Sequence, residues 1–102
     1  MPISTTARFA TAHAEKYLQQ LCKHWSHRFS VEVMPGKGRI AFSGDEALDL
    51  AADADGLTLV LRSTGDPAAH ADLERVVAEH LQRFAFREVF ALDWSGIDPD
   101  ET

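Results

Sequence analysis

Apolar residues recur at three- and four-residue steps in two parts of the chain, residues 13–29 and 64–86. This spacing lines the apolar side chains along one side of an α-helix, and it is typical of a helix packed on a core. Asp66 suits the N-cap of the second helix, and Pro67 suits its first position, where a missing N–H costs nothing. The predicted stripes are Ala14, Tyr17, Leu18, Leu21, Cys22, Trp25 and Phe29 in the first helix, and Leu73, Val76, Val77, His80, Leu81 and Phe84 in the second.

Alternating apolar and polar residues occupy the chain between these helices. The segments VEVM and RIAF flank the turn residues PGKG, so residues 31–43 are predicted to form a β-hairpin. ALDLAAD and LTLVLR flank ADG and predict a second hairpin. Residues 7–12 are predicted as a first strand, and residues 87–94 as a last strand or extended segment. The inward positions of the second hairpin are Leu48, Leu50, Ala52, Leu57, Leu59 and Leu61.

The predicted order of elements is β-α-β-β-β-β-α, with a closing β. The packing that buries every apolar face is a single antiparallel sheet covered on one face by two helices, an α+β fold. This order resembles that of TATA-binding-protein-like folds. Residues 1–96 are predicted to form a single α+β domain and residues 97–102 a polar C-terminal tail.

Composition and charge narrow the function classes. The chain has 102 residues, of which 45% are hydrophobic, and a formal net charge of -6. This acidic balance argues against nucleic-acid binding, which calls for a basic face. No apolar run approaches the roughly 18 residues of a membrane span, and the N-terminus lacks the features of a secretory signal. With a single cysteine, which fits a reducing compartment, the sequence predicts a cytoplasmic protein.

The segment LCKHWSHRF, residues 21–29, raises the question of a metal site formed by Cys22, His24 and His27. On a helix, at about 100° per residue, His24 lies about 160° and His27 about 140° around the axis from Cys22. A thiolate and imidazoles on nearly opposite sides of a helix cannot reach one ion at bond lengths of about 2.0 to 2.3 Å. Cys22 is therefore predicted to be a small buried apolar residue.

The remaining histidines leave alternatives open. His24 and His27, about 60° apart on a helix, either point at a common ligand or lie at the boundary and surface of the helix. His80 interrupts an apolar stripe, so it is either a core histidine bonded to a backbone carbonyl or side chain, or part of a pocket between helices and sheet. His13 and His70 are predicted to be surface residues near helix starts.

Other motifs favour structural roles. DADG, residues 53–56, lacks the further ligands of a calcium loop and is predicted to be a hairpin turn. In RFAFRE, residues 83–88, Phe84 and Phe86 are predicted to plug the core, whereas an exposed phenylalanine–arginine edge would indicate a partner surface. No nucleotide-binding, serine-hydrolase or zinc-protease motif is present, and no nucleophile, base and orienting residue form a recognisable set, so an enzyme is not expected.

The segments YLQQLCKHWSHRF, GRIAF, DADGLTLVL, HLQRFAFRE and the terminal DW resemble a family of small bacterial proteins of unknown function, over residues 7–94. Members of that family occur beside, or fused to, siderophore-interacting proteins, which are flavin-linked ferric-siderophore reductases. The resemblance implies an accessory or binding protein in ferric-siderophore or iron utilisation, with such a reductase or a ferric siderophore as its partner. It carries over no catalytic residue, metal or cofactor.

Histidines and arginines are the residues that such a function would use, since guanidinium groups bind anionic oxygen ligands. The predicted ligand-binding residues are His24, His27, His80, Arg28, Arg83 and Arg87. The alternative is a homodimer or other protein-interaction module without a small ligand, marked by an exposed apolar patch around Phe86, Phe90 or Trp94.

Overall fold

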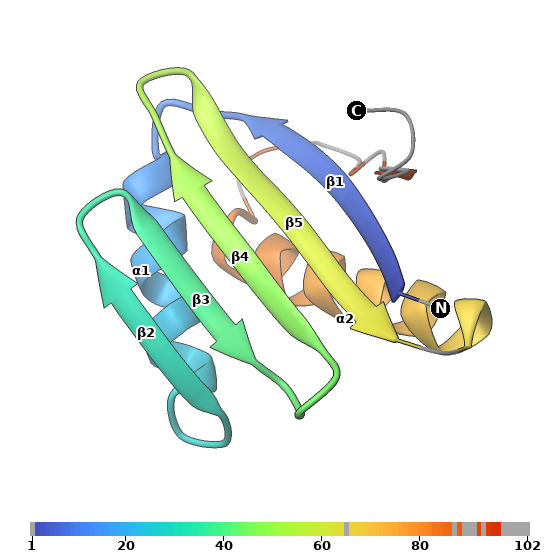
Figure 1. Ribbon diagram of the computed structural model, residues 1–102. Helices are drawn as coiled ribbons and strands as arrows, with labels where there is room; N and C mark the ends of the chain where they lie inside the picture. The colour runs from blue at the N-terminus through green and yellow to red at the C-terminus, as the bar shows by residue number, and fades with distance from the viewer. Residues whose placement is uncertain (1, 65, 87, 89–91, 93, 97–102) are drawn as a thin grey trace.

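Strands and helices follow one another in the order that the sequence predicts (Figure 1). The computed structural model describes residues 2–64, 66–86, 88, 92 and 94–96. The predicted tail and most of the predicted last strand lie outside these described residues. The elements are β1 (Pro2–Ala10), α1 (Ala14–Trp25), β2 (Ser30–Met34), β3 (Lys37–Ala41), β4 (Ala47–Ala52), β5 (Gly56–Thr64), α2 (Pro67–Phe84) and the short β6 (Ser95–Gly96).

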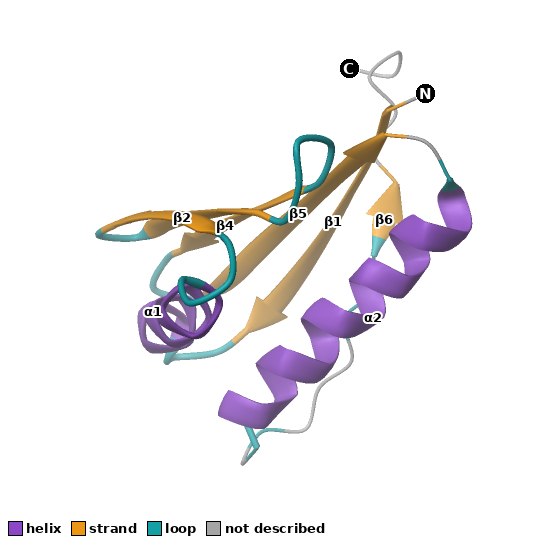
Figure 2. Ribbon diagram, turned by 90° about the horizontal axis from the view of Figure 1, so that it is seen from below, coloured by secondary structure: helices purple, strands orange, loops and turns teal. Residues whose placement is uncertain are grey.

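The strands form one antiparallel sheet in the order β2-β3-β4-β5-β1-β6. β1 pairs with β5 along its whole length, from Pro2 opposite Thr64 to Ala10 opposite Gly56. Both helices lie on the same face of the sheet, and the other face is open (Figure 2). The predicted α+β fold, with one sheet backed by two helices, is confirmed.

The core fills the space between the sheet and the helices. The inward leucines of the second hairpin are buried as predicted, with Leu57 and Leu59 at 0% exposure, and each contributes about 1.5–3 kcal/mol on burial. Helix α1 buries Leu18 and Leu21 against them, and α2 buries Val77. Successive side chains of a strand point to opposite faces of the sheet. The residues between these inward leucines therefore lie on the open face.

Strand β1 begins earlier than predicted, at Pro2 instead of residue 7. The alternating positions Ile3, Thr5, Ala7 and Phe9 share one face of β1, because Thr5 pairs with the buried Leu61. A threonine at an inward position interrupts the apolar alternation, which explains why the pattern did not reveal the first half of the strand.

Helix α1 ends at Trp25, earlier than the predicted residue 29. The backbone then turns, with the Arg28 and Phe29 N–H groups both donating to the Trp25 carbonyl, at 3.0 and 2.9 Å. The turn carries the ring of Phe29 onto Phe42, at a centroid distance of 5.0 Å. Phe29 therefore reaches the core without a further turn of α-helix.

The predicted turns and helix cap are also observed. Gly36 has a φ of 79°, which a glycine adopts without strain, in the turn between β2 and β3. Asp53 closes the second hairpin, because its Oδ1 accepts hydrogen bonds from the N–H groups of Asp55 and Gly56 at 2.8 and 2.9 Å. Asp66 caps α2 by accepting from the Ala68 N–H at 3.0 Å. Within the part of the chain described here, neither helix is long and apolar enough to span a bilayer.

Candidate functional site

His24 of α1 and His80 of α2 lie next to each other where the two helices meet, with ring centroids 5.3 Å apart. The ring of His80 also packs on Trp25, at a centroid distance of 5.0 Å. The ring of His24 makes an edge contact with Phe84 at 5.8 Å. The packing of α2 against α1 thus brings together two of the predicted ligand-binding residues that are far apart in the sequence.

A hydrogen bond fixes the proton position of His80, whose Nδ1 lies 2.7 Å from the carbonyl oxygen of Val76. Because a carbonyl only accepts, Nδ1 carries the proton, and in the neutral ring Nε2 keeps its lone pair. The half-buried ring is therefore held by a backbone carbonyl, which is one of the interpretations drawn from the sequence. The bond orients the ring and leaves Nε2 able to accept a proton or a hydrogen bond.

Positive charge concentrates around His24. Its pKa is lowered from the ordinary value, first because its packed neighbours remove water and then because of nearby charges. The charged or protonatable groups concerned belong to four of the other predicted residues, His80, Arg83, His27 and Arg28. We call these four residues, together with His24, the histidine–arginine cluster.

The histidine–arginine cluster contains every predicted ligand-binding residue that the structure describes, and Arg87 lies outside the described residues. His27, Arg28 and Arg83 are exposed. Several cationic or protonatable groups therefore share a small surface on a chain whose formal net charge is -6. Such a local excess of positive charge attracts anions, more strongly at low ionic strength than at high.

Beside the cluster lies a hollow of about 620 Å³ between the start of α1 and the end of α2. Phe84 links the two features, because its ring contacts His24 and also lines the hollow. Phe86 lines the hollow too and is 72% exposed, so its predicted place in the core is wrong. Helix α2 ends at Phe84, and the next residue, Ala85, takes the buried position with 0% exposure. The lining residues are Ala12, His13, Lys16, Tyr17, Phe84, Phe86 and Glu88.

Glu88 anchors one wall of this hollow. The hydroxyl of Tyr17 donates a short hydrogen bond to its Oε2, and the Thr11 hydroxyl donates to the same oxygen at 3.1 Å. The bond to Glu88 raises the pKa of Tyr17 to about 12, with burial and the carboxylate charge adding to the effect. Tyr17 thus remains a neutral hydrogen-bond donor, and its hydroxyl helps to hold the Glu88 carboxylate at the wall of the hollow. No sequence pattern indicated this pair, because the two residues belong to separate elements and meet only in the folded chain.

His70 corrects a second prediction, because it is 3% exposed and does not lie at the surface. Its Nδ1 lies 2.6 Å from the Ser63 hydroxyl, and its Nε2 lies 2.7 Å from the Thr5 hydroxyl. Thr5 also donates to Glu74, at 2.7 Å. We call these four residues the His70 network. It ties the first turn of α2 to β1 and β5.

Cys22 takes no part in either group. It is 1% exposed, and burial raises its pKa, so it remains a protonated thiol packed in the core. His24, two residues later, is exposed and faces α2. Over the residues that the structure describes, no three His, Cys, Asp or Glu side chains converge in a way that could hold a metal ion.

An antiparallel sheet backed by two helices, with a cationic cluster and an aromatic hollow where the helices meet, defines a small two-layer α+β domain with a candidate anion-binding site. Residues 6–95 match the profile of a family described as an uncharacterized protein conserved in bacteria (DUF2218), and the chain belongs to this family.

A solved structure supports the fold independently. The NMR structure of PA4090 from Pseudomonas aeruginosa is similar to this chain, with 38% sequence identity and a TM-score of 0.75. The match covers 91% of this chain and 95% of that one, so the similarity extends over the whole domain. A comparison with curated proteins gives no match.

Proposed function

We propose that this protein is a binding protein for anionic iron chelates of the ferric-siderophore class, which it holds where α1 and α2 meet. The observation that carries the proposal is the histidine–arginine cluster, which gathers His24, His80 and the exposed guanidinium groups of Arg28 and Arg83 on an acidic chain. The resemblance to proteins found beside siderophore-interacting reductases supports the same assignment.

Each part of this surface has a chemical role in the proposal. Arg28 and Arg83 bind the carboxylate or phenolate oxygens of the chelate through charge-assisted hydrogen bonds. Nε2 of His80 accepts a hydrogen bond from the ligand while Nδ1 remains bonded to Val76. The adjoining hollow, with Phe84 and Phe86 in its walls, takes the apolar parts of the ligand. Iron enters as cargo inside the chelate and needs no ligand from the protein.

The test is a thermal-stability and calorimetric titration of the purified protein with an anionic ferric tris-catecholate and with a neutral ferric tris-hydroxamate. A ligand present at one hundred times its dissociation constant stabilises the fold by about 2.7 kcal/mol. We expect the anionic chelate to bind more tightly, and the double variant Arg28→Gln, Arg83→Gln to weaken it about tenfold or more.

Arg75→Gln is the matched control, because Arg75 is an exposed arginine of α2 whose guanidinium pairs with Asp72 at 3.0 Å. It should leave binding unchanged. Absence of a stability shift with both chelates, or equal loss in the control and the double variant, would contradict the proposal.

A second candidate function rests on the 72% exposure of Phe86. A large exposed aromatic side chain is typical of a protein contact, and such a contact would serve a homodimer or the docking of a reductase. Light scattering of wild-type protein and of Phe86→Ser tests it. A dimer that the substitution converts to monomer supports an interaction module, whereas a monomer in both samples removes the homodimer.

A further inference from the structure

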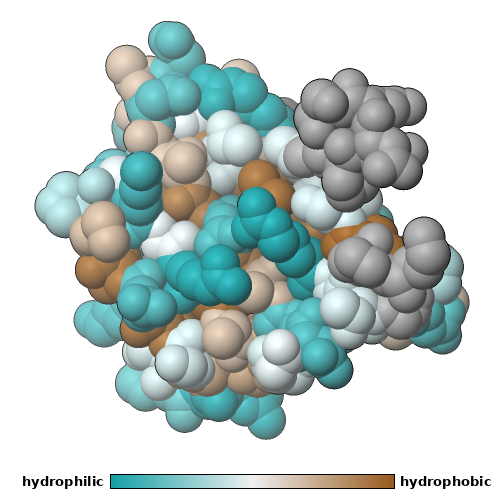
Figure 3. All heavy atoms as spheres, viewed as in Figure 1, coloured by the Kyte–Doolittle hydropathy of each residue, from teal (hydrophilic) through white to brown (hydrophobic). Residues whose placement is uncertain are grey.

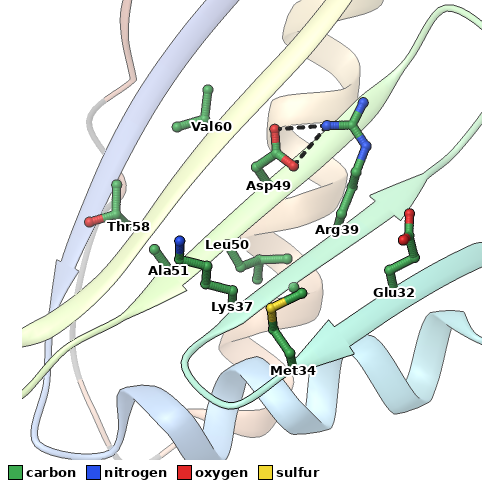
Figure 4. A pocket seen from close by; sticks show the side chains of 10 residues that line it. Glu32, Met34, Lys37, Arg39, Asp49, Leu50, Ala51, Thr58 and Val60 are labelled. Carbon is green, nitrogen blue, oxygen red and sulfur yellow. Dashed lines mark hydrogen bonds and ion pairs between the residues drawn. The ribbon is translucent and has the colours of Figure 1, made fainter.

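A second hollow, of about 360 Å³, lies on the open face of the sheet, across strands β2 to β5 (Figure 4). It is on the opposite side of the sheet from both helices, and hence from the histidine–arginine cluster (Figure 2). Its volume falls near the lower end of the range of small-molecule sites, which is about 300–1,000 Å³. Any ligand here would be independent of the chelate proposed above.

The strand register explains why this face is hollowed. Ala51 stands between two longer side chains on neighbouring strands, because it pairs with Lys37 of β3 on one side and with Thr58 of β5 on the other. Met34 pairs with Lys37 and extends the row at the sheet edge. The methyl group of Ala51 therefore forms a low point between taller neighbours, and Val60 closes the hollow beside Thr58.

The floor and walls are mainly apolar. Met34 is 57% exposed, and its flexible thioether adapts to apolar ligands of varied shape. Ala51 and Val60 add methyl groups to the same surface. In the space-filling view of this face, hydrophobic side chains lie among charged ones (Figure 3).

The charges around the hollow are unequally paired. Arg39 donates to both carboxylate oxygens of Asp49, at 3.0 and 3.2 Å, and Arg62 pairs with Asp49 as well. Lys37 and Glu32, which both line the hollow, have no ion-pair partner among the described residues. Glu32 stands opposite Arg39 in the strand register, whereas Lys37 stands between Met34 and Ala51. The hollow therefore joins an apolar surface to a lysine whose charge is available to a ligand.

We propose that this hollow binds an aliphatic monocarboxylate of medium chain length. The alkyl chain lies over Ala51, Val60 and Met34, where it displaces water from apolar surface, and the carboxylate pairs with the ammonium group of Lys37. A lysine offers a single compact charge, which suits one carboxylate better than a multidentate anion.

The test is a titration of uniformly ¹⁵N-labelled protein with octanoate, followed by amide chemical shifts. We expect saturable shifts at Lys37, Ala51 and Val60, and a weaker effect from 1-octanol, which has the chain without the charge. Lys37→Gln should weaken octanoate binding about fivefold and leave 1-octanol binding unchanged. Ala51→Leu, which fills the exposed low point, should abolish both.

Lys23→Gln is the matched control, since Lys23 is an exposed lysine of α1 on the other side of the molecule. Shifts confined to α1 and α2, equal binding of octanoate and 1-octanol, or equal losses in Lys37→Gln and Lys23→Gln would overturn the proposal. The chelate titration is read on the helices and this titration on the sheet, so either proposal can fail without the other.

Discussion

The Thr5 hydroxyl lies 2.7 Å from Nε2 of His70, although 65 positions separate the two residues in the chain. The direction of this hydrogen bond follows from its neighbour. Thr5 has one hydroxyl proton, and it donates that proton to the Glu74 carboxylate at 2.7 Å. Nε2 of His70 must then be the donor to Thr5, and in the neutral ring Nδ1 accepts from the Ser63 hydroxyl at 2.6 Å.

A neutral His70 therefore satisfies both of its ring nitrogens within the buried network. The chain of donors runs from Ser63 through His70 and Thr5 to Glu74, and it crosses from β5 to α2, to β1 and back to α2. Polar groups that are bonded in this way carry little penalty for burial, but each becomes costly when its partner is removed. The network thus fixes where the first turn of α2 sits on the sheet.

Replacing Thr5 with valine should lower the free energy of unfolding by about 1–3 kcal/mol. Valine keeps the shape and the strand preference of threonine, and it leaves the His70 N–H and the Glu74 carboxylate without their shared partner. Thr64→Val is the control, because Thr64 is an exposed residue of the neighbouring strand. Urea denaturation measures both variants, and equal losses would mean that the network contributes nothing specific.

Gly38 of β3 packs closely against Leu18 and Cys22 of α1. A Cβ atom built on Gly38 would lie 2.6 Å from Sγ of Cys22, so Gly38→Ala should destabilise the protein by about 1–3 kcal/mol through overcrowding. The matched control is Gly44→Ala, since nothing lies within 4 Å of that position.

The crowding at Gly38 can be assigned to the sulfur atom by a double-mutant cycle. In a Cys22→Ala background the obstructing Sγ is gone, so Gly38→Ala should cost less there than in the wild type. If the cost is the same in both backgrounds, then backbone strain in β3, and not the contact with Cys22, is responsible.

Local patterning was sufficient to predict most of the fold. Leu48 and Leu50 alternate with Asp49 because both leucines point to one face of the sheet, and Asp66 precedes Pro67 because both suit a helix start. Such signals depend only on neighbours in the sequence. Where the fold departs from the pattern, as at the start of β1, an inward polar residue, Thr5, is satisfied by a partner from a distant helix.

The sequence predicted the residues of the candidate site but not the contacts between them. Helical periodicity put His80 on the inner stripe of its helix, but the contact with His24 depends on how α2 crosses α1, which no local pattern encodes. The contact between Tyr17 and Glu88 and the burial of His70 likewise depend on how distant elements pack against each other. Phe86 was misplaced because α2 ends at Phe84 and leaves it beyond the last helical turn.

The Tyr17–Glu88 bond should be visible as a delayed ionisation of the phenol. Tyr17 is the single tyrosine of the chain, so ultraviolet absorbance reports it directly. We expect its pKa near 12 in the folded protein, against about 10 in the unfolded chain. Glu88→Gln should move the folded value down towards 10, while Glu79→Gln, an exposed glutamate of α2, should not.

The raised pKa of Tyr17 also determines the direction in which stability changes with pH. Between about pH 10 and pH 12 the unfolded chain loses the Tyr17 proton while the folded protein keeps it, so the free energy of unfolding falls as pH rises through this range. Tyr17→Phe should remove that part of the decline. A variant that declines as steeply as the wild type would show that other groups account for the alkaline instability.

His24 offers a direct test of charge crowding in the histidine–arginine cluster. Its lowered pKa means that between the folded value and about 6.5 the unfolded chain binds more protons than the folded protein. The contribution of His24 to the free energy of unfolding is therefore fully present above about pH 6.5, and it is lost as the pH falls below that value. Two-dimensional NMR of the imidazole resonances measures the pKa itself.

Removing a neighbouring charge should raise the pKa of His24, and so should binding an anion. We expect Arg83→Gln to shift it upward and Arg75→Gln, on the same helix but paired with Asp72, to leave it unchanged. An anionic ferric chelate bound at the cluster should shift it further upward, because a nearby negative charge favours the imidazolium. An upward shift with Arg83→Gln but none with the chelate would place the ligand elsewhere, even if the calorimetric titration showed binding.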